Sequence, residues 1–276
     1  MSFRVAPTAY DRFMGRYSRP LAVAFADWLG VSPGQRALDV GSGPGALTEV
    51  LTDRLGAASV VAVDPSEPFV GAIRDRLPGV TAIQASAENL PIDDESFDIV
   101  AAQLVVHFMT DPLAGVTELR RVTRTGGVVA LNVWDFEGAR SPLSAFLSVL
   151  KALEPDTDDE TDRTGARRGQ LGALLRDAGC RDVEESELSV VVTSPTFEDW
   201  WEPYTLGVGH DLSGACAHRH ARRRLSVQRT PRATHAVAGV SIGPSPSSSR
   251  QRVRISRCRS ASSAASCDPA GPTPSV

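Results

Sequence analysis

Residues 36–45 read RALDVGSGPG, and this stretch decides the fold. A short apolar run over 37–40 ends at the turn GSGPG over 41–45, and an amphipathic run over 47–55 follows. This order predicts a strand, a tight turn and a helix. Glycines in the turn permit positive φ and leave no Cβ between the backbone and a ligand, while a helix start adds unpaired N–H groups. We therefore expect the turn to hold a polar ligand close to the main chain.

The next apolar run, over 59–64, has the pattern of a buried strand and ends in Asp64, 19 residues after Gly45. An acid at that place suits a ribose diol, as in dinucleotide-binding folds. Pyrophosphate loops read G-x-G-x-x-G, however, and here Ala46 stands where the third glycine belongs. The spacing therefore argues against a dinucleotide. The alternative role for Asp64 is a helix N-cap ahead of Pro65.

The glycine turn resembles motif I of the class I S-adenosylmethionine-dependent methyltransferases, whose cofactor carries a ribose but no phosphate. VDPS over 63–66 is similar to the family's acidic ribose clamp, and AENLP over 87–91 with SFD over 96–98 resembles its A-E-x-L-P…S-F-D signature. RVTRTGG over 121–127 resembles its R-V-L-K-P-G-G turn. The resemblance covers roughly residues 10–209 and is nearest to the small-molecule branch of ubiquinone and menaquinone methyltransferases. It implies S-adenosyl-L-methionine as cofactor and a small-molecule oxygen, nitrogen or carbon as methyl acceptor.

Strand and helix patterns alternate from residue 36 onward, which predicts a parallel sheet with helices on both faces. The expected fold class is α/β, with a doubly wound and mostly parallel sheet. Ligands of such sheets bind at the carboxyl ends of the strands, where the strand order reverses. We expect strands over 36–41, 59–64, 80–85, 97–103, 127–134 and 181–192, and helices over 45–56, 66–77, 111–124, 142–153 and 169–178.

The resemblance also implies cofactor contacts at particular residues. Asp39 lies inside a strand, where an acid needs a partner, and the matching family acid supports the glycine loop and the amino acid end of the cofactor. Ser86 stands where the family often has an aspartate that contacts adenine, and a hydroxyl can still donate and accept. The implied cofactor site is Asp39, Gly41, Ser42, Gly43, Gly45, Asp64, Pro65, Ser86, Ala87, Glu88, Ala102 and Gln103, with no metal.

His107 is the candidate catalytic residue, because it is the only histidine in the first 209 residues and follows the strand over 97–103. Its ordinary pKa suits proton removal near neutral pH. The alternative is a structural histidine. Methyl transfer can also proceed without a base, because the sulfonium is already activated and positioning and water exclusion can supply most of the rate.

Two aromatic segments are candidates for covering the site. The helix predicted over 10–30 resembles the family's N-terminal lid, and aromatic residues near 200 begin another amphipathic helix. The alternative in both places is ordinary packing of an amphipathic face. The candidate lid and substrate residues are Tyr10, Arg16, Tyr17, Trp200 and Trp201.

The formal net charge of −4 conceals a division of the chain. Residues 1–209 hold 18 Lys and Arg against 31 Asp and Glu, whereas residues 210–276 hold 11 Arg against 2 Asp. No apolar run is long enough to span a bilayer, and the N-terminus lacks the apolar core of a signal peptide. The four cysteines form no C-x-x-C pair. We expect a cytoplasmic protein whose domain binds no nucleic acid.

Residues 210–276 are expected to be a disordered Arg/Ser/Pro/Ala-rich tail behind the domain over 1–209. They contain no Phe, Tyr or Trp, and only 9 of the 67 are Leu, Ile or Val. The family normally adds an antiparallel strand between its fifth and sixth strands, and we expect that strand to be missing here. A basic tail could bind nucleic acid or anionic membrane, but a shifted reading frame in a GC-rich gene is the interpretation we favour.

The acidic run over 154–162 is expected to be a solvated insertion.

Two competing functions remain open at this point. One is a cofactor-binding protein without catalysis, which tight cofactor binding without turnover of any acceptor would favour. The other is a nicotinamide-dependent oxidoreductase, against which the missing third glycine at Ala46 counts. The sequence leaves the acceptor unidentified, because acceptor pockets are lined by variable loops.

Overall fold

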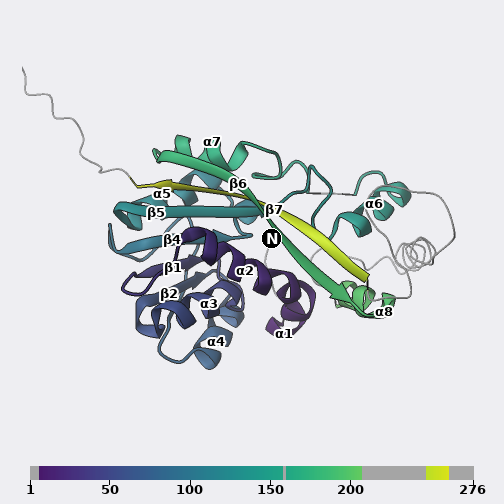
Figure 1. The fold of residues 1–276 in the computed structure, drawn as a ribbon, viewed down its shortest axis with the longest axis horizontal. Helices are drawn as coiled ribbons and strands as arrows, with labels where there is room; N and C mark the ends of the chain where they lie inside the picture. Colours follow the sequence, from purple (N-terminus) through teal and green to yellow (C-terminus); the bar gives the residue numbers. More distant parts are fainter. Residues whose placement is uncertain (1–5, 158–159, 207–246, 261–276) are drawn as a thin grey trace, which may run out of the picture.

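The computed structural model describes residues 6–157, 160–206 and 247–260 (Figure 1). Its strands form one seven-stranded sheet in the order β3-β2-β1-β4-β5-β7-β6. The first five strands of that order pair in parallel, and the doubly wound α/β fold is confirmed. The strand bounds are β1 (Ala37–Val40), β2 (Val60–Asp64), β3 (Thr81–Gln84), β4 (Phe97–Gln103), β5 (Thr123–Trp134), β6 (Arg181–Ser194) and β7 (Ser247–Arg259).

Helices cover both faces of the sheet (Figure 1). The α-helices are α1 (Pro7–Tyr10), α2 (Arg16–Leu29), α3 (Ala46–Leu55), α4 (Glu67–Arg76), α5 (Pro112–Val122), α6 (Ser144–Leu153), α7 (Gln170–Asp177) and α8 (Phe197–Trp201). Shorter turns are η1 (Asp11–Gly15), η2 (Ala57–Ser59), η3 (Val106–Phe108) and η4 (Glu202–Thr205). Helix α2 packs beside α3, and α5 packs beside α7. Most bounds lie within two residues of those expected, but β5 begins at Thr123 rather than at 127.

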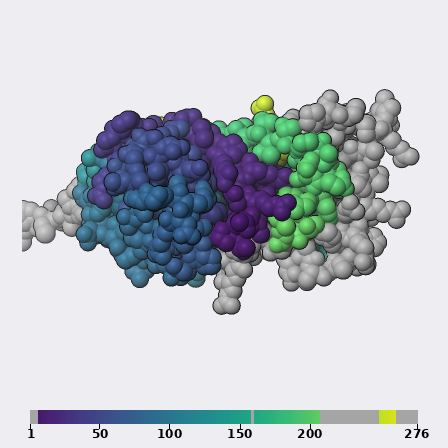
Figure 2. All heavy atoms as spheres, turned by 90° about the horizontal axis from the view of Figure 1, so that it is seen from below, coloured from purple at the N-terminus to yellow at the C-terminus, as the bar shows by residue number. Residues whose placement is uncertain are grey.

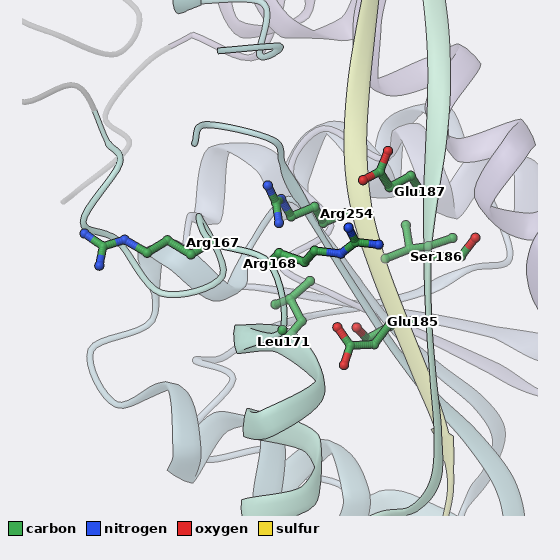
Figure 3. A pocket seen from close by; sticks show the side chains of 10 residues that line it. Arg167, Arg168, Leu171, Glu185, Ser186, Glu187 and Arg254 are labelled. Carbon is green, nitrogen blue, oxygen red and sulfur yellow. The ribbon is translucent and has the colours of Figure 1, made fainter. Parts of the chain in front are cut away.

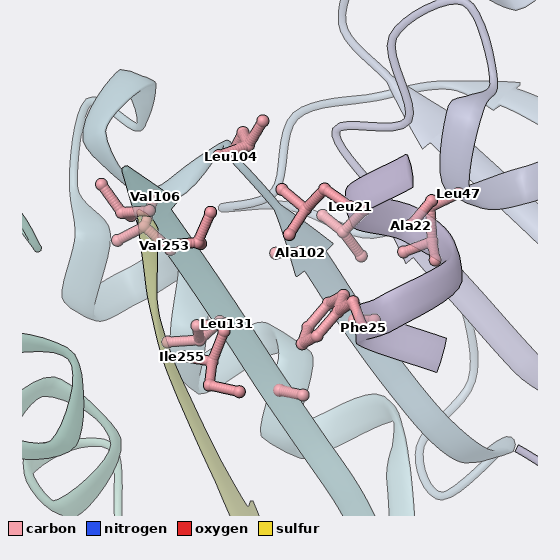
Figure 4. Packing of buried hydrophobic residues seen from close by; sticks show 14 of the residues in the cluster. Leu21, Ala22, Phe25, Leu47, Ala102, Leu104, Val106, Leu131, Val253 and Ile255 are labelled. Atoms are coloured by element: carbon pink, nitrogen blue, oxygen red, sulfur yellow. The ribbon is translucent and has the colours of Figure 1, made fainter. Parts of the chain in front are cut away.

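The expectation that the family's antiparallel strand is missing was wrong. Strand β7 occupies that place, between β5 and β6 and antiparallel to both. Its Val253 and Ile255 are fully buried and pack near Leu131 of β5 (Figure 4). The stretch RQRVRI over 250–255 alternates with a period of two, as a strand does, but arginines fill the polar positions and dilute the apolar composition. A missing strand was the main structural reason for suspecting a shifted reading frame, and that reason is now removed. The rest of the expected tail, residues 210–246 and 261–276, lies outside the described residues.

Charge complementarity joins β7 to β6. The guanidinium of Arg257 lies 2.8 Å from the carboxylate of Glu184, and that of Arg252 lies 3.2 Å from Glu187. Both pairs are partly exposed, so each contributes only about 0–1 kcal/mol. Their main effect is on register, because shifting β7 by one residue would move its apolar side chains to the opposite face of the sheet.

The core centres on α2 and the middle strands. Leu21 and Phe25 of α2 are fully buried, and in Figure 4 they face Ala102 of β4. The acidic run is less solvated than expected, because Glu160 is buried and lies 3.6 Å from the guanidinium of Arg163. Among the described residues, no helix is both long and apolar enough to cross a membrane.

Candidate functional site

The glycine loop lies at the carboxyl end of β1, and β1 separates β2 from β4 at the point where the strand order reverses. Gly41, Gly43 and Gly45 all have positive φ, at 69°, 54° and 97°. A Cβ on Gly41 would collide with the side chain of Val105. The N–H groups of Gly41 and Ser42 donate to the carbonyl of Val63, at 2.7 and 3.0 Å. The loop therefore needs its glycines both for conformation and for space.

Asp64 connects this loop to the end of β2. Its carboxylate accepts from the N–H of Gly43 and from the N–H of Ser66, each at 2.8 Å. The side chain is buried, and burial raises its pKa, while the two backbone hydrogen bonds lower it. The N-cap of α4 is Ser66, so Asp64 does not occupy the N-cap position considered above. Each carboxylate oxygen retains a lone pair for a further donor.

Asp39 lies behind the loop, buried in β1. Its Oδ2 accepts from the hydroxyl of Thr48 on α3 at 2.7 Å. Burial raises the pKa of Asp39 to about 7; the charge of Asp64 also raises it, and the bond from Thr48 opposes the shift. The sequence pointed to Asp39 but not to Thr48, although Thr48 lies one helical turn beyond the glycine loop.

The raised pKa of Asp39 predicts that the protein loses stability as pH rises from about 4 toward 7. The folded chain keeps a proton that the unfolded chain, with an aspartate pKa of about 3.9, has released. The free energy of unfolding should therefore fall in this window, by up to about 1.4 kcal/mol per pH unit. Urea unfolding of the wild type and of Asp39→Asn at several pH values isolates this contribution. Parallel pH profiles of the two proteins would contradict it.

The N-terminal segment closes over one end of the crevice. Gln103 at the end of β4 donates through Nε2 to the carbonyl of Ser18 at 3.1 Å. Tyr10 packs on Phe69 with ring centroids 5.2 Å apart, and its pKa is raised to about 12 by burial and then by the charge of Asp64. The remaining cavity is about 30 Å³, roughly the volume of one water molecule. A larger ligand enters this end only if the N-terminal segment moves.

Buried polar atoms remain unsatisfied around this cavity. Among the described residues, neither Oγ of Ser42 nor Oε1 of Gln103 has a hydrogen-bond partner. Both residues line the cavity, together with Asp39 and Gly43. Unpaired buried polar atoms are costly, so this end of the crevice is suited to a ligand that carries hydrogen-bond donors and acceptors.

The structure joins the N-terminal segment to α8. Arg16 donates to the carbonyls of Asp199 and Trp200, at 2.9 and 3.2 Å. Phe13 meets Tyr204 edge-on with ring centroids 5.5 Å apart. In Figure 2 the purple N-terminal residues lie against the green residues near 200. The two segments predicted to cover the site are therefore in contact with each other.

The aromatic candidates are mainly packing residues in this conformation. Trp200 and Trp201 are buried among other rings, and Trp201 lies 5.9 Å from Phe146 between ring centroids. Tyr17 is buried against the edge of Trp134 at 6.4 Å. Tyr10 lines the cavity at the glycine loop, whereas Trp200 and Trp201 line none of the cavities described here.

His107 lies in η3, directly beyond β4. Its ring packs on Phe108 and Phe136, with centroids 3.9 and 5.8 Å apart, and its Nδ1 has no partner among the described residues. Burial, and then the charge of Arg163, lower the pKa of His107 to about 3. The ring is therefore neutral at physiological pH and a weak base. Its catalytic role stays a prediction, and its packing agrees with the structural alternative.

The remaining predicted residues organise loops at the same sheet edge. Glu88 accepts from the N–H of Thr110 at 2.8 Å and so holds the turn before α5. Ser86 is exposed, and Ala87 and Ala102 are buried. The carbonyl of Pro65 accepts from Gln84 at 3.0 Å.

A second hollow, of about 290 Å³, lies between α7, β6 and β7 (Figure 3). Arg254 projects into it but is paired with Asp135 and Glu137, at 2.7 and 2.9 Å, while Arg167 points away. Strands β4 and β5 separate β7 from β1, so this hollow does not open on the glycine loop.

Comparison with known proteins bears on the identity of this site. Residues 38–131 match the family described as the methyltransferase domain. An uncharacterized methyltransferase of Mycobacterium tuberculosis is 39% identical over 140 residues, which are 51% of this chain and 54% of the relative. The chain thus spans about half the length of this relative. A demethylmenaquinone methyltransferase of Beutenbergia cavernae is 31% identical over 173 residues, covering 58% of this chain and 71% of that enzyme.

The chain belongs to the class I S-adenosylmethionine-dependent methyltransferase family. Within that family it falls in the branch of the quinone methyltransferases. The solved structure of YcgJ from Bacillus subtilis has the same fold, with a TM-score of 0.56 over 89% of this chain and 99% of that one, at 16% identity. The family therefore accounts for the glycine loop, the acid after β2 and the sheet order together.

Proposed function

We propose that this chain transfers a methyl group from S-adenosyl-L-methionine to a small-molecule oxygen, nitrogen or carbon. The observation that carries the proposal is the buried carboxylate of Asp64, bound to the glycine loop at the reversal of strand order. The family membership supports a methyl donor, and the relative named for demethylmenaquinone supports a small-molecule acceptor. A cytoplasmic location remains a prediction of the sequence.

The residues at the crevice fit this cofactor. Asp64 offers carboxylate lone pairs to two ribose hydroxyls. Gln103 Oε1 and Ser42 Oγ, which are buried and without a partner among the described residues, would receive the polar amino acid end. Asp39, close behind the loop, would balance its ammonium charge once it releases the proton that burial retains up to about pH 7. No residue set for a pyrophosphate accompanies the loop, because Ala46 replaces the third glycine of that fingerprint.

When bound, the cofactor supplies a methyl group already activated on a sulfonium. The chain's own residues then have to position the two reactants and exclude water. The N-terminal segment is placed for the second task, since Tyr10 and Ser18 already cover the cavity beside the loop. His107 is a weak base in its half-buried site, so an acceptor that needs no deprotonation suits this arrangement.

The first competing function is cofactor binding without catalysis. It predicts tight binding of the cofactor product and no turnover of any acceptor, so an assay with radioactive methyl donor and a panel of acceptors separates it from the proposal. The second is nicotinamide-dependent oxidation, which requires NAD binding. The glycine spacing counts against this second function.

Calorimetric titration of the 276-residue chain with S-adenosylhomocysteine and with NAD tests the proposal. We expect micromolar binding of the first and no binding of the second, because the loop has a ribose acid but lacks the pyrophosphate fingerprint. Circular dichroism of the same sample establishes that the protein is folded. A well-folded α/β protein that ignores S-adenosylhomocysteine would contradict the proposal.

A further inference from the structure

Two cysteines far apart in the sequence, Cys180 and Cys258, lie side by side in the folded chain. Both side chains are buried, at 6% and 2% exposed. The thiol of Cys258 donates a hydrogen bond to the sulfur of Cys180. Both cysteines are free in this structure. Two thiols in contact form a pair that oxidation can join in a disulfide.

The strand register explains why the two cysteines meet. Strands β6 and β7 are antiparallel, and Arg181 pairs with Arg259. Each of these arginines directly follows one of the cysteines. The register then shifts, so that two residues of β6 lie opposite Cys258 alone, and Asp182 in this bulge has a φ of 53°. Because side chains alternate along a strand, Cys180 and Cys258 lie on the same face of the sheet, opposite to the face of the two arginines.

A nearby cation makes Cys180 the more acidic thiol of the pair. The guanidinium of Arg120 on α5 lies beside Gly179, where a Cβ would be 3.5 Å from its Cζ. The hydrogen bond from Cys258 lowers the pKa of Cys180, burial raises it, and the charge of Arg120 also lowers it, so the net shift is downward. The pKa of Cys258 is raised by its hydrogen bond to Cys180 and by burial. Cys180 is therefore the partner that supplies a thiolate, the nucleophile in thiol oxidation.

The position of Cys180 in the fold gives a small oxidant a route to its sulfur. Cys180 directly precedes β6, and β6 is an edge strand of the sheet. Its two neighbours in the chain, Gly179 and Arg181, are exposed. Proteins open locally at a lower free energy than that of global unfolding. Opening of this edge can therefore expose the sulfur while the rest of the sheet stays folded.

We propose that Cys180 and Cys258 are a reversible oxidation site, at which hydrogen peroxide joins them in a disulfide that links β7 to the start of β6. The thiolate of Cys180 attacks one peroxide oxygen and the O–O bond breaks. Cys180 becomes a sulfenic acid, and the departing hydroxide takes a proton from solvent. The sulfur of Cys258 then attacks the sulfenic sulfur, the S–O bond breaks, and the second hydroxide takes the thiol proton. Two thiols lose two electrons, and one peroxide is reduced to two waters.

The disulfide would act on the attachment of β7. In the reduced protein, β7 is held to β6 by strand pairing and by partly exposed ion pairs such as that of Arg257 with Glu184. A disulfide that closes a long loop lowers the entropy of the unfolded chain, and this stabilises the folded one. In the cytoplasm, where the sequence predicts this protein, disulfides are transient and respond to oxidising conditions. The inference does not depend on the proposed function.

Peptide mapping of the wild-type chain tests the proposal directly. The folded protein is treated with hydrogen peroxide, the remaining thiols are alkylated, and a tryptic digest made without reductant is analysed by mass spectrometry. We expect a product that joins residues 177–181 to residues 258–259 and is lighter by two hydrogen atoms than the two reduced peptides together. Dithiothreitol should separate the two peptides again. Absence of this product, with or without links at Cys216 and Cys267, overturns the proposal.

Urea unfolding measures the effect of the bond on the fold. Peroxide should raise the urea midpoint of the wild type by about 1 M, because a long loop is closed, and dithiothreitol should reverse the rise. Cys180→Ser should abolish the rise. The control Cys216→Ser, which removes a cysteine outside the described residues, should preserve it. Circular dichroism checks that both variants are folded.

The outcomes of the two measurements are separable. A rise that persists in folded Cys180→Ser overturns the proposal, since it would come from another site. An unchanged midpoint in wild-type protein that carries the linked peptide overturns the stabilisation of β7. Mapping of the wild type needs no variant, so it decides whether the disulfide forms even if Cys180→Ser is unfolded.

Discussion

Replacing Ile255 by Asp should abolish the cooperative unfolding transition of this protein or lower its unfolding free energy by at least about 4 kcal/mol. Ile255 is 1% exposed in β7, which pairs on both sides, with β5 and with β6. The new carboxyl group would be buried among apolar side chains such as those in Figure 4, without an arranged partner. A loss of that size is a large part of the 5–15 kcal/mol typical of a domain.

The matched control is Arg250→Asp, which introduces the same side chain at an exposed position of the same strand. Urea unfolding followed by circular dichroism measures both variants. We expect the control to change the unfolding free energy by less than about 1 kcal/mol. Equal and small effects of both substitutions would mean that residues 247–260 do not belong to the sheet.

Replacing Asp64 by Asn should weaken binding of S-adenosylhomocysteine by about 100-fold, or about 2.7 kcal/mol. The carboxylate is proposed to accept from ribose hydroxyls, and hydrogen bonds to a charged group are worth about 1.5–3 kcal/mol each. Asparagine would also turn an N–H₂ group toward either Gly43 N–H or Ser66 N–H, both of which now donate to Asp64. Calorimetry gives the ratio of the dissociation constants.

Asp75→Asn is the control for this substitution, because Asp75 is an exposed carboxylate on α4 beyond the crevice. It removes the same charge from the chain, so it isolates the local effect of Asp64 from the change in net charge. Its affinity should equal that of the wild type. Affinity preserved to within threefold in a folded Asp64→Asn protein would count against the ribose role.

The parallel part of the fold was predictable because its strands are short, continuous apolar runs. Buried on both faces, β1 and β4 carry few polar residues, and glycines mark the turn after β1. The antiparallel strand was missed for the opposite reason. In β7, arginines occupy every second position around Val253, so its apolar content resembles that of an unfolded segment although its period is that of a strand.

The candidate site was predictable only where local sequence determines it. The glycine loop and Asp64 follow from chain order, and the structure brings them together. The closure of the crevice does not follow from local pattern, because the bond from Gln103 to Ser18 joins residues 85 positions apart. The burial of Glu160 beside Arg163 likewise depends on how the insertion packs, which an acidic run by itself does not indicate.

The position of β7 has a consequence for how the chain is made. The ribosome delivers β5 and β6 long before β7, yet β7 pairs with both, and Leu131 meets Ser256 across 125 residues. Until β7 emerges, β5 and β6 each present an unpaired edge, which invites pairing with other chains. Folding of the sheet should therefore be completed late in synthesis, and a nascent chain stalled before residue 247 should bind holdase chaperones and aggregate when they are withheld.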